Sequence, residues 1–397
     1  MPFEAAIEFA RDLIRIPGLS GDEGAVAERV RVEMERLGFD EVRLDEVGNV
    51  IGRIVGGSPG PVVALCSHMD VVDAGDPGTW EHDPYGGAVV DGFLHGRGAM
   101  DIKGPLALQL HAAAQLAGSS FGGEVWMVCT VYEERAGWGI AHFLEHADRL
   151  PDVVVIGEAT AGDLCIGHRG RAEIVVEIQG LAGHASAPER ARSAIDGLPA
   201  VLAGLASFAE TLESDAVLGR STFVPTGIET APISPNVIPD LARVTVDWRV
   251  LPGVDADAAV ERVRRHLERE ATLPEGLSLE VRFSTVRQRS YTGREAERRL
   301  FTPAYRLAED DAVVERARAS IQASTGTRPV VRPWRFATDG GYACGVHGIP
   351  TIGYAPGEER HAHTNRERLS LEHARVVHDA YAPLIRSLLE MPAHQEA

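Results

Sequence analysis

The sequence predicts an α/β fold in which helices cover a mostly parallel sheet, with a smaller α+β domain inserted into it. In the first 170 residues, short apolar runs alternate with helical patterns, which is typical of a parallel sheet. After Gly170 the order becomes β-α-β-β-α-β, which is typical of a ferredoxin-like unit. The chain has 397 residues, more than one typical core holds. We therefore expect a first domain of residues 1–171 and 287–397, and an inserted domain of residues 172–286.

The first part of the chain supplies most elements of the larger domain. Ser20-Gly21-Asp22-Glu23 has the form of a capping box, which would open the second helix. Gly104-Pro105 opens a later helix, because proline is favoured in the first helical turn. Helices are expected at residues 3–15, 26–37, 104–116 and 137–146, and strands at residues 41–44, 50–55, 61–66, 124–131 and 152–156.

The inserted domain and the return to the larger domain follow from the same patterns. The inserted strands are expected at residues 173–179, 221–229, 242–250 and 277–284, with helices at 193–212 and 255–270. The Arg- and Glu-rich stretch 287–299 is expected to be a solvated linker. A helix at 311–325, a strand at 350–354 and a final helix from residue 371 complete the larger domain.

The composition is that of an ordinary soluble globular protein, with 44% hydrophobic and 24% charged residues. The formal net charge of -19 repels nucleic acid and anionic membranes, so neither is an expected partner. The N-terminus lacks the pattern of a signal peptide, and no run approaches the roughly 20 apolar residues of a membrane span. The four cysteines are far apart in the sequence. Reduced thiols and a cytoplasmic location are therefore expected.

Acidic residues and one histidine follow several predicted strands or lie in a glycine-rich turn. Because the carboxyl ends of parallel strands meet at one edge of a sheet, we expect these side chains to lie close together. Taken singly, a lone histidine or a pair of glutamates is more often solvated or structural, but chance seldom brings so many to one edge. They are His68, Asp70, Asp101, Glu133, Glu134 and Glu158.

This mixture of carboxylates with few imidazoles suits zinc, cobalt or manganese, and several carboxylates can bridge two such ions. The neighbouring Glu133 and Glu134 permit a division of labour, in which one binds metal and the other accepts a proton from water. Asp70 beside His68 fits a carboxylate that orients a metal-bound imidazole.

These residues belong to motifs that resemble those of the M20 family of metallopeptidases and amidohydrolases. The family includes acetylornithine deacetylase, succinyl-diaminopimelate desuccinylase, aminoacylase and glutamate carboxypeptidase. The resemblance implies a zinc-exopeptidase-like catalytic domain with an inserted lid and dimerisation domain. The motifs are Ser67-His68-Met69-Asp70-Val71-Val72, Gly96–Gly104, Glu133-Glu134, Gly157-Glu158-Ala159, Gly183-His184-Ala185-Ser186-Ala187-Pro188 and Ala362-His363.

The resemblance also implies roles for these residues around two divalent ions per chain, with zinc expected first and cobalt or manganese as alternatives. One ion would be held by His68, Asp101 and Glu158, and the other by Asp101, Glu134 and His363. Glu133 would be the general base, Asp70 would orient His68, and the Asp101–Ile102 peptide bond would be cis. His361 is the alternative to His363, although the Ala-His pattern and Glu367 four residues later favour His363.

The inserted domain carries further candidates. In relatives with this domain, the residue matching His184 stabilises the oxyanion in the partner subunit's site; the alternative is a turn histidine bonded to Ser186. Asn236 and Arg249 lie in a stretch that resembles the family's lid motif and would bind the substrate's carboxylate. The alternative for Arg249 is a surface arginine on a strand. Residues 338–341 resemble a family loop near the substrate.

The sequence thus predicts a homodimeric, binuclear metal-dependent hydrolase of amide bonds. Its substrate would be an N-acyl amino acid or a short peptide with a free carboxylate. A non-catalytic, metal-free relative that acts as a binding or scaffold protein is the alternative, but the intact Glu133 and ligand set argue against it. A metal-dependent phosphoesterase would require basic residues at the site, and the sequence shows no phosphate-binding glycine loop.

Overall fold

The computed structural model describes residues 3–393, and the chain divides into two compact units. The first unit contains the residues up to 168, residues 287–296 and the residues from 305 onward. The second unit contains residues 169–286 and 297–304. The expected boundary at 171/172 thus lies three residues from the observed one, and residues 297–304 rejoin the second unit.

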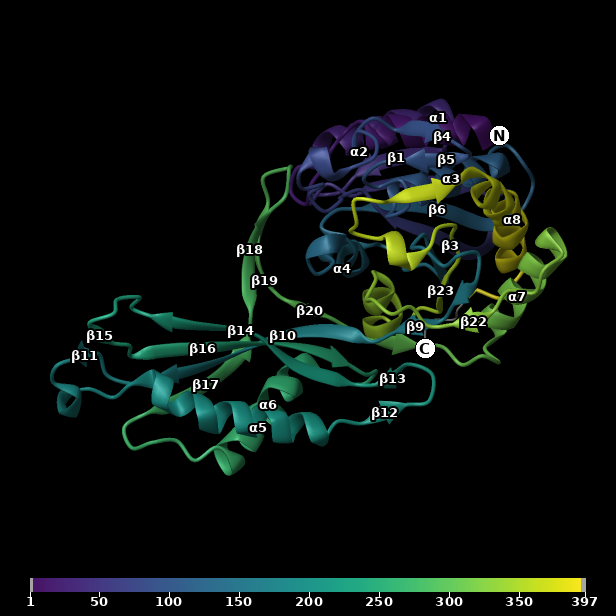
Figure 1. The fold of residues 1–397 in the computed structure, drawn as a ribbon. Coiled ribbons are helices and arrows are strands. Elements are labelled where there is room, and N and C mark those ends of the chain that lie inside the picture. The colour runs from purple at the N-terminus through teal and green to yellow at the C-terminus, as the bar shows by residue number, and fades with distance from the viewer. Residues whose placement is uncertain (1–2, 394–397) are drawn as a thin grey trace. The chain divides into compact units, whose positions relative to one another are not determined.

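An eight-stranded mixed sheet forms the centre of the first unit (Figure 1). Its strand order is β1-β2-β6-β3-β7-β23-β8-β22. The central strands β6, β3, β7 and β23 run parallel to one another, as predicted, and β1–β2, β2–β6 and β23–β8 are antiparallel. The strands are β1 (Glu41–Leu44), β2 (Val50–Val55), β3 (Ser58–His68), β6 (Gly122–Thr130), β7 (Val153–Ile156), β8 (Leu164–Cys165), β22 (Val331–Arg332) and β23 (Thr351–Gly353).

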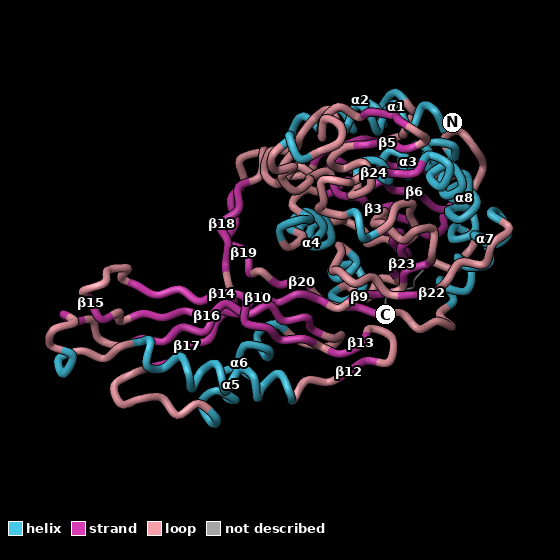
Figure 2. Tube along the Cα trace, viewed as in Figure 1, coloured by secondary structure: helices cyan, strands magenta, loops and turns pink. Residues whose placement is uncertain are grey.

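Helices cover both faces of this sheet (Figure 2). Successive side chains of a strand point to opposite faces, so Val63 and Leu65 of β3 enter one core while Val62 and Ala64 enter the other. The first core includes residues of α1 (Phe3–Ile14), α2 (Gly24–Arg36), α3 (Lys103–Ala113), α7 (Ala312–Thr325) and α8 (Leu371–Leu389). The second core includes residues of α4 (Trp138–His146) and the helical segment Gly341–Val346.

Two local predictions for this unit are wrong. Helix α2 begins at Gly24 without a side-chain cap, because Ser20 and Glu23 bond to other segments. The stretch expected to be a solvated linker instead forms a hairpin of β18 (Thr285–Arg289) and β19 (Glu295–Arg299). Near its turn, the Tyr291 hydroxyl donates to a backbone carbonyl oxygen of the first unit at 2.8 Å, which ties the turn down.

The second unit has the predicted β-α-β-β-α-β order. Its antiparallel sheet has the order β14-β16-β10-β17, which is the ferredoxin-like arrangement, and β20 (Phe301–Thr302) adds to β10. In β16, Val244, Val246 and Trp248 face the helices, while the alternate residues line the open face of the sheet. The elements are β10 (Gly170–Gln179), α5 (Leu198–Glu210), β14 (Thr222–Ala231), β16 (Leu241–Val250), α6 (Ala256–Glu270) and β17 (Ser278–Phe283).

Short strands complete the two units. The first unit also contains a small three-stranded sheet of order β24-β5-β4. The short strands are β4 (Ala88–Val90), β5 (Phe93–His95), β9 (Gly167–His168), β11 (Gly183–His184), β12 (Ser214–Asp215), β13 (Gly219–Arg220), β15 (Val237–Ile238), β21 (Tyr305–Arg306) and β24 (Arg368–Ser370). Between residues 3 and 393, no helix has both the length and the apolar composition to cross a membrane. All four cysteines are free thiols, as predicted.

Candidate metal centre

The first unit gathers imidazole and carboxylate side chains at the carboxyl edge of its parallel strands. Each arrives at the end of a strand or in the turn that follows, where the backbone leaves the sheet and side chains can converge. His68 ends β3, Glu133 and Glu134 follow β6, and Glu158 follows β7. Asp101 precedes α3, and His363 lies in the loop after β23.

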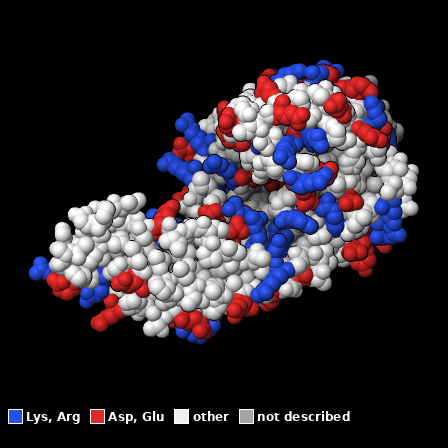
Figure 3. Space-filling model, in the orientation of Figure 1, with Lys and Arg blue, Asp and Glu red and all other residues white. Residues whose placement is uncertain are grey.

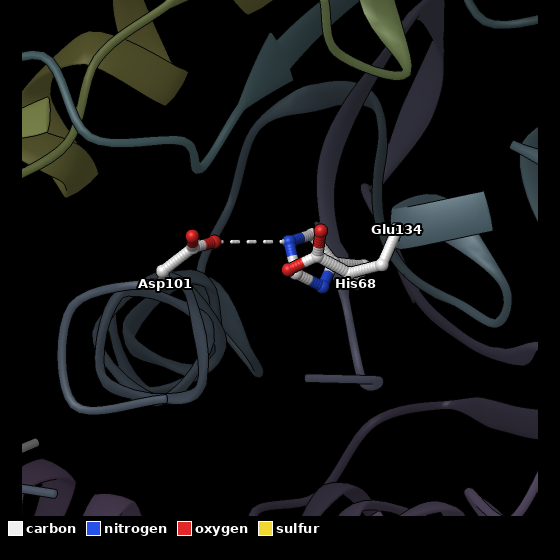
Figure 4. Close-up of side chains that lie close together, drawn as sticks. All are labelled: His68, Asp101 and Glu134. Carbon is white, nitrogen blue, oxygen red and sulfur yellow. Dashed lines mark ion pairs between the residues drawn. The ribbon is translucent and has the colours of Figure 1, made fainter. Parts of the chain in front are cut away.

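Asp101 lies between two imidazoles. Its Oδ1 is 3.4 Å from Nε2 of His68, and its Oδ2 is 3.3 Å from Nε2 of His363. Glu158 Oε1 lies 3.1 Å from His68 Nε2, and Glu134 Oε1 lies 3.0 Å from His363 Nε2. Figure 4 shows the His68 ring directed at Asp101, with Glu134 beside it. Each histidine thus shares the central aspartate and has one glutamate of its own.

This donor set fits divalent metal ions. The ligand atoms of His68, Asp101 and Glu134 lie within 4.8 Å of one another, and so do those of His68, Glu133 and Glu158. The His68 side chain is 1% exposed, and its buried Nε2 has no hydrogen-bond partner. A buried imidazole nitrogen aimed at carboxylates is the arrangement that zinc and related ions use. His363, and not His361, faces this cluster.

The electrostatics of the cluster agree with a site for cations. Burial raises the pKa of Glu158 to about 7 and that of Glu133 well above its usual value. Hydrogen bonds to Asp101 and Glu134 raise the pKa of His363 to about 10. Without cations, protons must therefore offset the carboxylate charges. Bound metal would displace these protons, because metal ligands must be deprotonated.

Two buried carboxylates hold the turn that presents Glu133 and Glu134. Three successive backbone N–H groups donate to them: that of Tyr132 to Glu23 Oε1 at 3.1 Å, and those of Glu133 and Glu134 to Asp70 at 3.1 and 3.2 Å. Tyr132 has φ of +58°, in the left-handed region that non-glycine residues seldom adopt. By accepting these N–H groups, the two carboxylates offset the energetic cost of the unusual backbone conformation.

Asp70 contacts His68 mainly through its backbone. Nδ1 of His68 lies 2.8 Å from the Asp70 carbonyl oxygen and 3.6 Å from its Oδ1. The Asp70 carboxylate accepts the Ser20 hydroxyl at 2.6 Å in addition to the two N–H groups of the turn. The carbonyl contact fixes which ring nitrogen of His68 faces the metal site.

The backbone of Asp101 is held by the carboxylate of Glu367, a residue whose place in the sequence served only to favour His363 over His361. Glu367 Oε1 accepts the N–H groups of Met100 and Asp101, both at 3.0 Å, and its Oε2 accepts Arg97 at 2.5 Å. Glu367 is 1% exposed and Arg97 is 3% exposed. The Asp101–Ile102 peptide bond is cis, as the resemblance implied.

Sequence reasoning missed the part that Ser20 and Glu23 play here, because their spacing matches a helix cap. For Asp339 the sequence predicted only a loop near the substrate, and the structure places this residue beside the metal cluster. Asp339 Oδ2 accepts the Thr130 hydroxyl at 2.8 Å, while its buried Oδ1 has no partner. Burial raises the pKa of Asp339 to about 6, and its charge adds to the raised pKa of Glu133.

The remaining candidates lie in the second unit. His184 Nδ1 accepts the Ser186 N–H at 3.1 Å, and the strand pairing β11–β15 places His184 opposite Val237, next to Asn236. Arg249 pairs with Asp247 at 2.8 Å. Asn236 comes before β16, which begins at Leu241, and Arg249 is the next-to-last residue of that strand, so the length of β16 lies between them. Asn236 and Arg249 thus lie toward opposite ends of β16.

Comparison with known proteins identifies the family of this chain. The family model for "Peptidase family M20/M25/M40" matches residues 64–387. The chain belongs to this family. It is 32% identical over 387 residues to the uncharacterized protein YgeY of Escherichia coli (strain K12), covering 96% of this chain and 94% of that protein. It is also 32% identical over 409 residues to the succinyl-diaminopimelate desuccinylase of Methylorubrum extorquens (strain PA1), covering 96% of this chain and all of that enzyme.

Solved structures of M20 proteins share the fold. The metallo-carboxypeptidase Sso-CP2 of Sulfolobus solfataricus matches with a TM-score of 0.78 at 16% identity, over 97% of this chain and 99% of that one. The YXEP protein of Bacillus subtilis, a dinuclear metal binding peptidase, matches with a TM-score of 0.71 at 20% identity, over 98% of each chain. The present chain is thus an M20 hydrolase with the α/β fold of its family, and its candidate metal cluster lies within one unit.

Proposed function

We propose that this M20 hydrolase cleaves the amide bond of N-acyl amino acids or short peptides that carry a free carboxylate, with two divalent ions per chain. The observation that carries the proposal is the position of Asp101, whose two oxygens face His68 and His363 separately. Glu158 would complete one ligand set and Glu134 the other. When bound, the two ions would polarise the amide carbonyl and lower the pKa of the attacking water.

In this proposal Glu133 moves the proton. Its carboxylate lies within 4.8 Å of the ligand atoms of His68 and Glu158 but belongs to neither pair around Asp101. It would take a proton from water as the carbonyl is attacked and deliver it to the leaving amine. The raised pKa of Glu133, caused by burial, suits a group that must carry this proton between two steps.

The test is the substitution Glu133→Gln, which keeps the shape of the side chain and removes its basicity. We expect turnover to fall by about 10²–10⁴-fold while two metal ions remain bound. The assay would follow amine release from N-acetyl, N-succinyl and N-formyl amino acids and dipeptides, after reloading with zinc, cobalt or manganese. Glu145→Gln, at an exposed position of α4, is the matched control.

Near-normal turnover in Glu133→Gln would refute this mechanism. The best substrate in the panel would separate a deacylase from an exopeptidase. The most active reloaded ion would show which metal supports catalysis best, and we propose zinc. A wild-type protein that binds no metal and hydrolyses nothing would instead support the alternative, a scaffold protein.

We further propose a homodimer through the inserted domain, in which His184 and Asn236 act in the partner's site and Arg249 binds a substrate carboxylate. The short pairing of β11 with β15 places His184 and Asn236 close together, which supports the proposal that both act at the same site. Arg249 would act at a different place. Mixing inactive Glu133→Gln chains with His184→Ala chains tests this, because a mixed dimer would contain one complete site. Activity that stays at the level of the separate variants would contradict it.

A further inference from the structure

A cavity in the first unit, apart from the metal cluster, has the chemistry of an anion site. It has a volume of about 450 Å³ and is lined by residues 79–82, His95, residues 360–361 and residues 365–368, on either side of His363 in the sequence. Asn365 Nδ2 donates to the Thr79 carbonyl oxygen at 2.9 Å, which joins two walls. The pairing of β24 with β5 places Arg368 opposite His95, and it thereby joins the segments of the lining that carry these two residues. A side-chain hydrogen bond and a strand pairing therefore link the segments that line the cavity.

Arginines dominate the charge of this cavity. Arg360 pairs with Glu358 at 2.7 Å. Arg366 and Arg368 are exposed, and neither forms an ion pair with any carboxylate in the part of the chain that the structure describes. The guanidinium of Arg368 lies over the Phe93 ring, 4.2 Å from its centroid, which limits its freedom without neutralising it. Two guanidinium groups are thus available to a ligand.

The acids of the lining do not cancel this charge. Glu367 is already bonded to Arg97 and to two backbone N–H groups, so Glu81 is the remaining carboxylate. The other walls are His82 and His95, whose ring centroids lie 4.4 Å apart, and Trp80. Burial is the main cause that lowers the pKa of His95, and His82 and Arg368 lower it further, whereas Glu81 raises it.

This local charge contrasts with the rest of the protein. The chain has a formal net charge of -19, and acidic and basic side chains are interspersed over the surface seen in Figure 3. Its overall field repels anions, so attraction must come from a local arrangement. Guanidinium groups suit this task, because their planar fork binds carboxylate or phosphate oxygens in pairs.

We propose that this cavity binds the oxyanion group of a small molecule, a carboxylate or a phosphate, through Arg366 and Arg368. The oxyanion has two possible sources. One is a second acid group on the substrate, which rests on the proposed function. The other is a free oxyanion that binds independently of catalysis.

Direct binding tests the site without any need for turnover. Inorganic phosphate and succinate would be titrated calorimetrically into the full-length protein at pH 8, where ordinary imidazoles are neutral. We expect at least tenfold weaker binding of a probe to Arg366→Gln/Arg368→Gln, at unchanged metal content and melting temperature. Arg318→Gln/Arg386→Gln removes the same charge elsewhere in the first unit and should bind as the wild type does. Equal binding to both double variants, or no binding to the wild type, would overturn the proposal.

Kinetics then separate the two sources. If the substrate supplies the oxyanion, Arg366→Gln/Arg368→Gln should raise KM for N-succinyl amino acids and leave KM for N-acetyl amino acids unchanged. If the oxyanion is free, phosphate should alter turnover of both series in the wild type and of neither in the variant. Failure of the proposed function would appear as absent hydrolysis with binding intact, whereas failure of this site would appear in the titration itself.

Discussion

At the scale of single residues, Glu23 shows how one side chain can serve a distant site. It is fully buried, and its Oε1 accepts the N–H of Tyr132, the residue before the proposed base. Its other oxygen has no partner. Burial raises the pKa of Glu23 to about 7, and the nearby Asp70 carboxylate adds to the effect. Below about pH 7 the protonated form of Glu23 is thus favoured in the folded protein.

This shift predicts a pH dependence of stability. The folded protein binds the Glu23 proton more tightly than the unfolded chain, whose glutamate has an ordinary pKa near 4.5. The associated stabilisation is complete below about pH 4.5 and is lost as pH rises through about 7. In Glu23→Gln this loss should be absent. As the pH rises from 5 to 8, the free energy of unfolding should therefore fall less in the variant than in the wild type.

Denaturant unfolding of metal-free protein at the two pH values measures this difference. Asp22→Asn is the control, because Asp22 adjoins Glu23 in the sequence but is exposed. A difference between Glu23→Gln and wild type that is the same at pH 5 and pH 8 would show that Glu23 does not titrate in this range.

At the scale of elements, the Arg97–Glu367 pair fastens the residues before β24 to the turn before α3. Both side chains are buried, and Glu367 also satisfies the N–H groups on which the position of Asp101 depends. The packing is close at this point: a Cβ on Gly104 would lie 2.1 Å from the Ala99 carbonyl oxygen. The turn therefore has little freedom to adopt another path.

Removal of Glu367 should be strongly destabilising. Glu367→Ala removes the ion-pair partner of the buried Arg97 and the acceptor of two backbone N–H groups, and we expect a loss of about 3–5 kcal/mol in the free energy of unfolding. Glu367→Gln keeps an oxygen for the N–H groups and should lose less. Chemical denaturation measures both, with the exposed Glu372→Ala as control. Equal losses in the Ala and Gln variants would show that the N–H contacts contribute nothing.

At the scale of the whole molecule, each unit has its own hydrophobic core, and the candidate metal ligands all belong to the first unit. Metal should therefore stabilise the first unit directly. At a free ion concentration of 100 Kd, a single site contributes about 2.7 kcal/mol. We expect chelation to lower the melting temperature and reloading with zinc to restore it.

Loss of one ligand should remove one of the two ions and leave the other bound. His363→Ala should reduce the bound metal from two ions to one per chain, because His68 and Glu158 remain on the other side of Asp101. Elemental analysis after dialysis measures this, and His361→Ala, two residues away, should keep both ions. Two ions in His363→Ala, or a loss in His361→Ala, would reverse the assignment of the ligand.

Much of this protein is determined by local sequence. The apolar runs and helical patterns predicted the central parallel strands, the ferredoxin-like order and the helices to within a few residues, because burial on a sheet or helix imposes a period of 2 or 3.6. Strand ends also located His68, Glu133 and Glu158, since parallel strands deliver their carboxyl ends to one edge.

Contacts between distant segments were decided only by the tertiary structure. Ser20 and Glu23 have the spacing of a helix cap, yet the Ser20 hydroxyl donates to Asp70 and the Glu23 carboxylate accepts the N–H of Tyr132. The pairing of Glu367 with Arg97 and the choice of His363 over His361 likewise depend on which loops meet. Sequence periodicity reports which face of an element is buried, whereas the partner of a buried polar group is fixed only when the chain folds back on itself.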